Sequence, residues 1–224
     1  MLLNIDAGEL AGEPEELYAL AHVVNIACGG HAGDDASMRR VIACCHRFGV
    51  RAGAHPSYPD REGFGRLPMS MTSEALEAAV AEQCHALVSI ARNAGDVPLG
   101  FVKLHGALYH AANADADVAK AALAGAIEAL GWEITVIGPV AGTTVVVARE
   151  LGLAFAREGF ADRNVLADGS LVPRGQPAAM IEDPARAADR ARELAKSGTV
   201  DTICVHGDGP NALSIARAVR AALS

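Results

Sequence analysis

Short apolar stretches and longer amphipathic segments alternate along the whole chain. The longer segments repeat their apolar positions at helical spacing, which predicts helices. The short stretches predict strands, because they are apolar and bounded by turn-forming residues. Strands that alternate with helices pair in parallel through right-handed crossovers, so we expect a single parallel sheet. Its seven predicted strands are Leu2–Asp6, His22–Cys28, Arg51–His55, Phe101–His105, Ile134–Gly138, Leu153–Arg157 and Thr202–His206.

Start and stop signals for helices fall between the predicted strands. Asp34 is a candidate N-cap for a helix that ends at Gly49. Ser73 opens a long helix that ends at Gly95. Proline is favoured at the first position of a helix. The other predicted helix starts are Asp183-Pro184 and Gly209-Pro210.

Polar residues gather at the C-terminal end of nearly every predicted strand. In a barrel of alternating strands and helices these ends converge, so residues far apart in the sequence meet in one pocket. An open doubly wound sheet also satisfies the alternation, but it concentrates its ligands at one switch point. The pattern therefore favours a barrel, an enzyme, and one domain over residues 1–224. The strand-end residues are Asp6, Glu9, Asn25, His31, Asp34, His55, Lys103, His105, Asp162, Arg163, His206 and Asp208.

Spacing and burial refine the interpretation of these residues. Side chains two positions apart on a strand share a face, so a polar pair at this spacing enters the barrel together. A lysine within an apolar strand is costly to desolvate, so we expect Lys103 to meet a carboxylate or an anionic ligand. Arg163 forms either an ion pair with Asp162 or a fork for a carboxylate or phosphate. Asp34 and Asp208 have a second interpretation as helix caps. The three polar pairs are Asn4 and Asp6, Lys103 and His105, and His206 and Asp208.

Composition limits the compartment and the partners. A net charge of −8 and a pI near 5.4 leave no basic stripe for phosphate backbones, which argues against nucleic-acid binding. The uncharged run Ile134–Ala148 is too short for a membrane span of about 20 residues. Five cysteines without a C-x-x-C pair favour buried free thiols in a reducing compartment. With no signal segment at the N-terminus, we expect a cytoplasmic protein.

Glycine-rich turns and histidines indicate two kinds of ligand. The turns at Gly29-Gly30 and Gly207 open helices whose N-termini attract anions, but no phosphate-loop motif is present. His31 and Asp34 stand at H-x-x-D spacing. Together with Asp6 and His55 they would be the ligands of a metal, if one is present. No H-E-x-x-H motif or cysteine pair supports such a site, so the presence of a metal stays open.

Eight blocks of the chain together resemble the LamB/YcsF family over nearly the whole length. They are NIDAGE (4–9), NIACGGHAGD (25–34), GAHPSYPD (53–60), GFGR (63–66), KLHGALYH (103–110), FADR (160–163), DGSLVPR (168–174) and TICVHGDGP (202–210). The resemblance implies a distorted (β/α) barrel related to the glycoside hydrolase/deacetylase barrels. It also implies ATP-dependent opening of 5-oxo-L-proline to L-glutamate, with Mg²⁺ accompanying ATP, in a complex with the B and C subunits of 5-oxoprolinase. The loop from Glu9 to His22 is shorter than is usual in the family.

The resemblance also carries residues over by position. Phosphorylation of the lactam oxygen would activate a stable cyclic amide towards water, and the matching residues offer bases, acids and cations for this step. The matched positions outside the proposed site include Gly8, Pro56, Asp60 and Asp168. The candidate catalytic residues are Asp6, Glu9, His31, His55, Lys103, His105, His206 and Asp208. The candidate substrate- or phosphate-binding residues are Asn25, Asp34, Asp162, Arg163 and Arg174.

Two other functions fit the same residues. One is a metal-dependent amidohydrolase or carbohydrate deacetylase that works without ATP, which stoichiometric zinc or iron would favour. The other is a non-catalytic subunit that only binds substrate, although scaffolding needs neither a buried lysine nor convergent histidines. The sequence leaves open which subunit binds ATP, which carboxylate is the base, and whether the chain forms a homo-oligomer.

Overall fold

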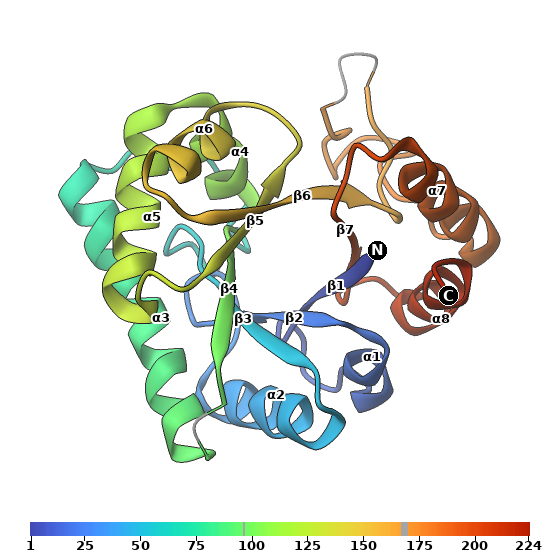
Figure 1. Ribbon diagram of the computed structural model, residues 1–224, viewed down its shortest axis with the longest axis horizontal. Coiled ribbons are helices and arrows are strands. Elements are labelled where there is room, and N and C mark those ends of the chain that lie inside the picture. Colours follow the sequence, from blue (N-terminus) through green and yellow to red (C-terminus); the bar gives the residue numbers. More distant parts are fainter. Residues whose placement is uncertain (96, 167–169) are drawn as a thin grey trace.

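Seven parallel strands form a closed barrel in chain order, and the first strand pairs with both the second and the last. The computed structural model describes residues 1–95, 97–166 and 170–224. Figure 1 shows the strands as an inner ring, with the N-terminus at the barrel wall. The strands are β1 (Leu2–Ala7), β2 (Val23–Ala27), β3 (Arg51–His55), β4 (Leu99–Lys103), β5 (Thr135–Pro139), β6 (Ala154–Phe160) and β7 (Thr202–His206).

Helices surround the strands and cover their outer faces (Figure 1). Two helices, α4 and α5, follow β4, and a long excursion precedes α7. The described parts of that excursion, residues 161–166 and 170–183, carry two isolated bridges, Arg163 to Met180 and Val165 to Leu171. The helices are α1 (Glu15–Leu20), α2 (Asp35–Phe48), α3 (Ser73–Asn93), α4 (Gly106–Ala114), α5 (Ala116–Leu130), α6 (Thr143–Glu150), α7 (Pro184–Ser197) and α8 (Ala212–Ala222).

Strand alternation separates an apolar outer face from a polar interior. On β1, Leu3 and Ile5 pack into the main core beneath the helices. Asn4 and Asp6 point the other way, and both hydrogen-bond to Asn25 of β2 inside the barrel. The expected sharing of one face by Asn4 and Asp6 is therefore confirmed, because side chains two apart on a strand lie on the same side.

A small apolar layer lies beneath this polar layer. Val23, Phe101, Ile137 and Ala156 form a separate buried cluster, with one member from each of four strands. Val23 precedes Asn25 by two positions, and Phe101 precedes Lys103 by two, so each shares the interior face of its polar neighbour. The interior is thus apolar towards the amino ends of the strands and polar towards their carboxyl ends.

The barrel prediction is confirmed, with corrections to several boundaries. β4 spans Leu99–Lys103 rather than Phe101–His105, because the chain leaves the strand to make His105 the N-cap of α4. β6 continues past Arg157 to Phe160 and stays paired with both neighbours. The last helix begins at Ala212, since residues 207–211 form turns.

The predicted helix signals at Asp34, Ser73 and Asp183 are confirmed. Asp34 caps α2 through a reciprocal capping box with Ser37, and Gly49 ends that helix in the left-handed conformation. Asp183 caps α7 by accepting the N–H of Arg186. α3 begins at Ser73, with Thr72 as its N-cap.

The structure also tests the expectations about free thiols and membrane-spanning segments. All five cysteines are free and buried, as predicted. Within residues 1–95, 97–166 and 170–224, no helix is both long and apolar enough to span a membrane.

Candidate functional site

A buried ionic group occupies the polar layer of the barrel. The Lys103 ammonium lies 3.0 Å from each carboxylate oxygen of Asp6 and 2.8 Å from Oε1 of Glu158. It also lies 3.1 Å from Sγ of Cys204. Asp6, Lys103 and Glu158 come from β1, β4 and β6, and all three are almost fully buried. The expectation that Lys103 meets a carboxylate is therefore confirmed.

Electrostatics keep this group ionic at its centre. Burial raises the pKa of Asp6, but His55 and Lys103 lower it by more, so it stays well below its ordinary value. Burial lowers the pKa of Lys103, but Asp6, Cys204 and Glu158 together raise it well above its ordinary value. Burial raises the pKa of Glu158 above its ordinary value despite the nearby ammonium. Asp6 and Lys103 therefore form the charged pair at the barrel floor.

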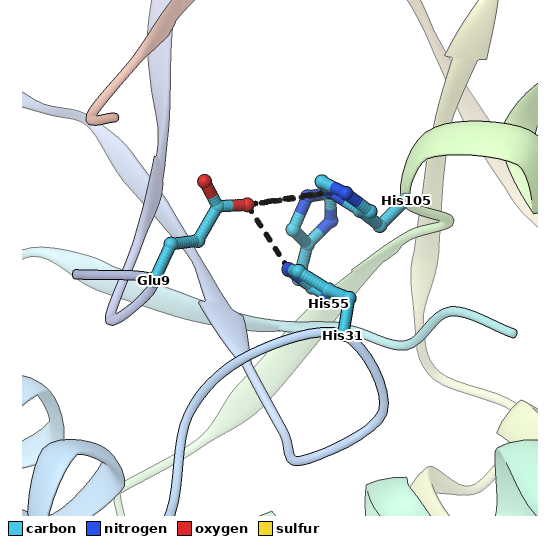
Figure 2. Close-up of side chains that lie close together, drawn as sticks. All are labelled: Glu9, His31, His55 and His105. Carbon is cyan, nitrogen blue, oxygen red and sulfur yellow. Dashed lines mark hydrogen bonds and ion pairs between the residues drawn. The ribbon is translucent and has the colours of Figure 1, made fainter. Parts of the chain in front are cut away.

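Beside this group, Glu9 and three histidines form what we call the histidine cluster: Glu9, His31, His55 and His105 (Figure 2). Oε1 of Glu9 lies 3.1 Å from Nε2 of His31 and 3.3 Å from Nδ1 of His105. Nε2 of His55 lies 3.0 Å from that same Nδ1 and 3.7 Å from Oε1 of Glu9. All four residues are buried, and their ligand atoms lie within 4.8 Å of one another.

The four side chains of the cluster come from the carboxyl ends of the first four strands. Glu9 follows β1, His31 follows β2, His55 ends β3, and His105 follows β4. The rings of His31 and His105 stack in parallel, with centroids 3.6 Å apart. Burial lowers the pKa of His55 to about 3, which keeps that ring neutral.

The GFGR block packs directly on the stacked rings. Phe64 has a φ of 55°, and its carbonyl accepts the Nε2–H of His105 at 3.0 Å. Gly65 has a φ of 64°, and a Cβ there would lie 2.7 Å from Cβ of His31. Glycine is required at this position by both its conformation and the contact. The loop therefore positions His31 and His105.

A second histidine arrangement lies across the barrel floor. Asp162 accepts the backbone N–H of His206 at 2.8 Å and faces its Nδ1 at 3.0 Å. Burial raises the pKa of Asp162, but the histidine outweighs it, so the pKa is below its ordinary value. A carboxylate on Nδ1 leaves Nε2 free to accept a proton, and Nε2 lies 3.8 Å from Asp6.

The barrel mouth opens into a pocket of about 370 Å³. Asp6, Lys103 and His206 contribute to its lining, and the rim is cationic. Asp208 accepts a hydrogen bond from Arg66 at 2.5 Å and one from Arg174 at 2.7 Å. These three residues tie the connections after β3, β6 and β7 together over the floor. The volume suits a small molecule, and the arginines suit an anionic group on it.

Several sequence-predicted residues have other positions or partners than expected. Asp34 is exposed and caps α2, the second of its two interpretations, so it does not join His31 and His55. Asp208 makes rim ion pairs and caps no helix. Arg163 donates to the carbonyls of Val172 and Ala179 and not to Asp162. These two hydrogen bonds connect Arg163 to the segment that precedes α7. Asp168 lies outside the described residues.

Several contributors to the site were missed from the sequence, including Arg66 of the rim and Cys204 beside Lys103. Glu158 lies one residue past the predicted end of its strand, and the demand of Lys103 for a carboxylate was the signal that could have found it. Tyr109 donates its hydroxyl to Glu158 at 3.2 Å. Glu13 accepts the backbone N–H groups of Gly8, Glu9 and Leu10, which fixes the turn that presents Glu9. The only feature of the sequence that could have indicated this role is that Glu13 follows closely after the turn at Gly8, where its carboxylate can accept backbone N–H groups.

The fold is a closed parallel β/α barrel that occurs in other proteins of known structure. A family 4 carbohydrate esterase from Streptomyces lividans shares it at 11% identity and a TM-score of 0.50, covering 100% of this chain and 86% of the esterase. A GH18 chitinase from Pseudoalteromonas aurantia shares it at 12% identity and a TM-score of 0.55, covering 97% and 99%. These likenesses concern the fold alone.

The chain belongs to the LamB/YcsF family, whose model matches residues 1–224. The lactam utilization protein of Thermus thermophilus superposes with a TM-score of 0.90 at 35% identity, covering 100% of this chain and 95% of that protein. Two relatives are named as the A subunit of 5-oxoprolinase. The one from Methylococcus capsulatus is 44% identical, over 99% of this chain and 91% of its own length. The one from Chloroflexus aggregans is 42% identical, over 97% and 92%.

Proposed function

We propose that this chain is the component of an ATP-dependent 5-oxoprolinase that holds the lactam while its ring opens to L-glutamate. The observation that carries the proposal is the Asp6–Lys103 pair on the floor of a small pocket with an arginine rim. Relatives named as the 5-oxoprolinase A subunit and a lactam utilization protein support the substrate class. Their naming as one subunit of several supports assembly with further chains, which we propose to be the B and C subunits.

The reaction divides into activation and hydrolysis. Transfer of the γ-phosphoryl group of ATP to the lactam oxygen breaks the terminal P–O bond, releases ADP and leaves an imidate phosphate. One water adds to the ring carbon, and the C–N bond then breaks as the nitrogen takes a proton. A second water releases phosphate from the resulting acyl phosphate. Each step moves charge that fixed cations and proton carriers stabilise.

The pocket residues divide these tasks by position. Lys103 neutralises negative charge at the floor, and Arg174 and Arg66 attract the carboxylate or phosphate at the rim. Asp6 is the carboxylate that lies beside the pocket floor and positions water. His206, oriented by Asp162, carries the proton for the ring nitrogen.

Turnover by the purified complex with its partner subunits tests this assignment. Asp6→Asn and Lys103→Met should each lower the release of phosphate and glutamate by about 100-fold or more, because each removes a group that handles charge or protons. Asp201→Asn is the matched control, since Asp201 pairs with Arg157 just before β7, at the amino end of the barrel. Circular dichroism checks that each variant is folded. Wild-type turnover in both site variants would reject the assignment.

Coupling to ATP needs its own measurement. We expect this chain, mixed with its partner subunits, to hydrolyse ATP faster when 5-oxoproline is present. The chain alone provides the reference. Equal ATP hydrolysis with and without 5-oxoproline in the full complex would contradict the proposed coupling.

The histidine cluster favours a second candidate, metal-assisted hydrolysis of an amide or ester without ATP. Three imidazoles and a carboxylate are the donor set of many hydrolytic metal sites. Release of glutamate or acetate in the absence of any nucleotide would favour this candidate over the first.

A further inference from the structure

Two histidines of the cluster point nitrogen lone pairs at each other. Nδ1 of His55 lies 2.7 Å from the carbonyl of Lys103, and Nε2 of His105 lies 3.0 Å from the carbonyl of Phe64. A carbonyl only accepts, so these two nitrogens carry the hydrogens of their rings. The remaining nitrogens face each other at 3.0 Å, and in neutral rings both are acceptors. Something positive must lie between them.

The group closest to the two nitrogens is another acceptor, the carboxylate of Glu9. Oε1 of Glu9 lies within 3.7 Å of both nitrogens, and Oε2 of the same carboxylate has no hydrogen-bond partner. His31 faces Oε1 of Glu9 with Nε2, and its other ring nitrogen, Nδ1, is a second buried atom without a partner. Among the described residues, Glu9 has no ion pair with a lysine or arginine. The cluster is rich in electron pairs and lacks a cation.

Four of the six separations between the ligand atoms are close to those of tetrahedral coordination. Zinc binds histidine nitrogen at about 2.0–2.1 Å and carboxylate oxygen at about 2.0–2.2 Å, so neighbouring ligand atoms of a tetrahedron lie about 3.3–3.5 Å apart. These four separations are 3.0, 3.1, 3.3 and 3.7 Å, and all six lie within 4.8 Å. Because the rings of His31 and His105 are stacked in parallel, one of them would rotate to direct both nitrogens at a single ion. The backbone carbonyls behind His55 and His105 are also what metal-bound histidines use to orient their rings.

We propose that Glu9, His31, His55 and His105 bind one divalent first-row transition-metal ion, with Zn²⁺ as the best match. Imidazole ligands favour zinc and its neighbours over Mg²⁺, which prefers oxygen ligands. His55 and His105 also line the substrate pocket, so the ion would stand in its wall.

The neighbouring group of Asp6, Cys204 and His206 does not need such an ion. The Lys103 ammonium already lies within 3.1 Å of the carboxylate and the thiol sulfur there. This built-in cation places the metal at the histidine cluster rather than at the ionic group. The metal set expected from the sequence is thereby replaced: Asp6 belongs with Lys103, and Asp34 caps a helix.

Metal content, measured without substrate or nucleotide, tests this proposal independently of the ring-opening reaction. The full chain, expressed with added Zn²⁺ and dialysed, should hold about one zinc per chain by elemental analysis. After chelation, refilling with Zn²⁺ should raise the melting temperature, since an ion that binds only the folded state stabilises it. Co²⁺ should give the visible absorption of a four-coordinate site, and Mg²⁺ should give no effect.

Variants locate the ion. Glu9→Gln and His105→Asn should each weaken Zn²⁺ binding by about 100-fold or more, because each removes a ligand. His85→Gln, an exposed histidine on α3 that faces Glu128, should bind zinc as the wild type does. His206→Gln should also keep the metal, since His206 lies in the other group. Circular dichroism of the chelated variants separates lost binding from lost folding.

Two results would overturn the proposal. If the wild-type chain takes up neither Zn²⁺ nor Co²⁺, a proton shared by His55 and His105 balances the cluster instead. If His206→Gln loses the metal while His105→Asn keeps it, the ion belongs to the group of Asp6, Cys204 and His206.

Discussion

The polar interior of the barrel has two halves that are both buried but differ in how their charges are balanced. Around Lys103, an ammonium lies between the carboxylates of Asp6 and Glu158 and supplies their counter-charge from the chain itself. In the histidine cluster, Glu9 meets only imidazoles, and two of their nitrogens face each other as acceptors. Burial is costly for an unbalanced group. One half therefore contains its own cation, and the other calls for a ligand.

The contrast distinguishes polar residues that hold a pocket together from those that receive something from outside. In the first half, Asn25 donates to Asn4 and Asp6. Nothing comparable reaches Nδ1 of His31 or Oε2 of Glu9 among the described residues. Mutations in the first half should therefore act chiefly on stability and turnover. Mutations near the second should act chiefly on metal content.

Lys103→Met should have the largest effect on stability. It leaves the buried Asp6 and Glu158 carboxylates without their cation, and breaking such a group costs about 3–5 kcal/mol. Urea denaturation of the variant measures this loss. Asp201→Asn breaks a half-exposed pair with Arg157 and should cost about 0–1 kcal/mol. A similar small loss in both variants would mean that Lys103 does not balance the interior.

Gly65→Ala should come next, at about 2–4 kcal/mol, because its methyl group meets His31 in a left-handed backbone conformation. Gly49 is the matched control: its φ is 65°, against 64° at Gly65, and a Cβ there meets nothing within 4 Å. Gly49→Ala should therefore cost only about 1 kcal/mol. Denaturant midpoints compare the two. Equal losses would mean that the GFGR loop does not press on the histidine cluster.

Tyr109→Phe should cost about 1.5 kcal/mol, since it removes one hydrogen bond to the buried Glu158 carboxylate and leaves the ring in place. Zinc content should not change, because Glu158 belongs to the half around Lys103. Denaturation and elemental analysis of the same preparation check both points. A loss of zinc without a loss of stability would contradict the division into two halves.

Asp34→Ala should have the smallest effect, about 1 kcal/mol of stability, because its carboxylate caps α2. Asp34→Asn retains capping ability and should be nearly neutral. Both variants should keep wild-type turnover and zinc content at a temperature where they are folded. Reduced turnover in Asp34→Asn would return this residue to the binding site.

Much of the barrel was predictable, because its determinants are local. Apolar stretches with polar ends indicated the seven strands, and Asp183-Pro184 indicated the start of α7. For Asp34 the sequence offered capping as one of its interpretations, and the structure selects it. The convergence of Asp6, Lys103 and His55 followed from the geometry of parallel strands, whose carboxyl ends meet. Alternation alone placed Asn4 and Asp6 on one face.

The division of the site into two halves was not predictable, because it depends on contacts between distant strands. Lys103 and Glu158 meet through barrel closure, and a strand end misplaced by a few residues hid the glutamate. The left-handed turn at Phe64 and Gly65 sets which nitrogen of His105 faces the cluster. Asp34 and His31 lie three apart in the sequence, yet the capping box turns Asp34 towards Ser37.

The apolar layer of Val23, Phe101, Ile137 and Ala156 affects how reactants and products can enter and leave the barrel. These four side chains fill the barrel below the polar layer, and the pocket lies on the other side of that layer, under the arginine rim. We therefore expect reactants and products to pass through the same opening, beside Arg66 and Arg174. A ring-opened product, longer and with one more carboxylate than its lactam, would leave past Arg66 and Arg174 before the next substrate arrives.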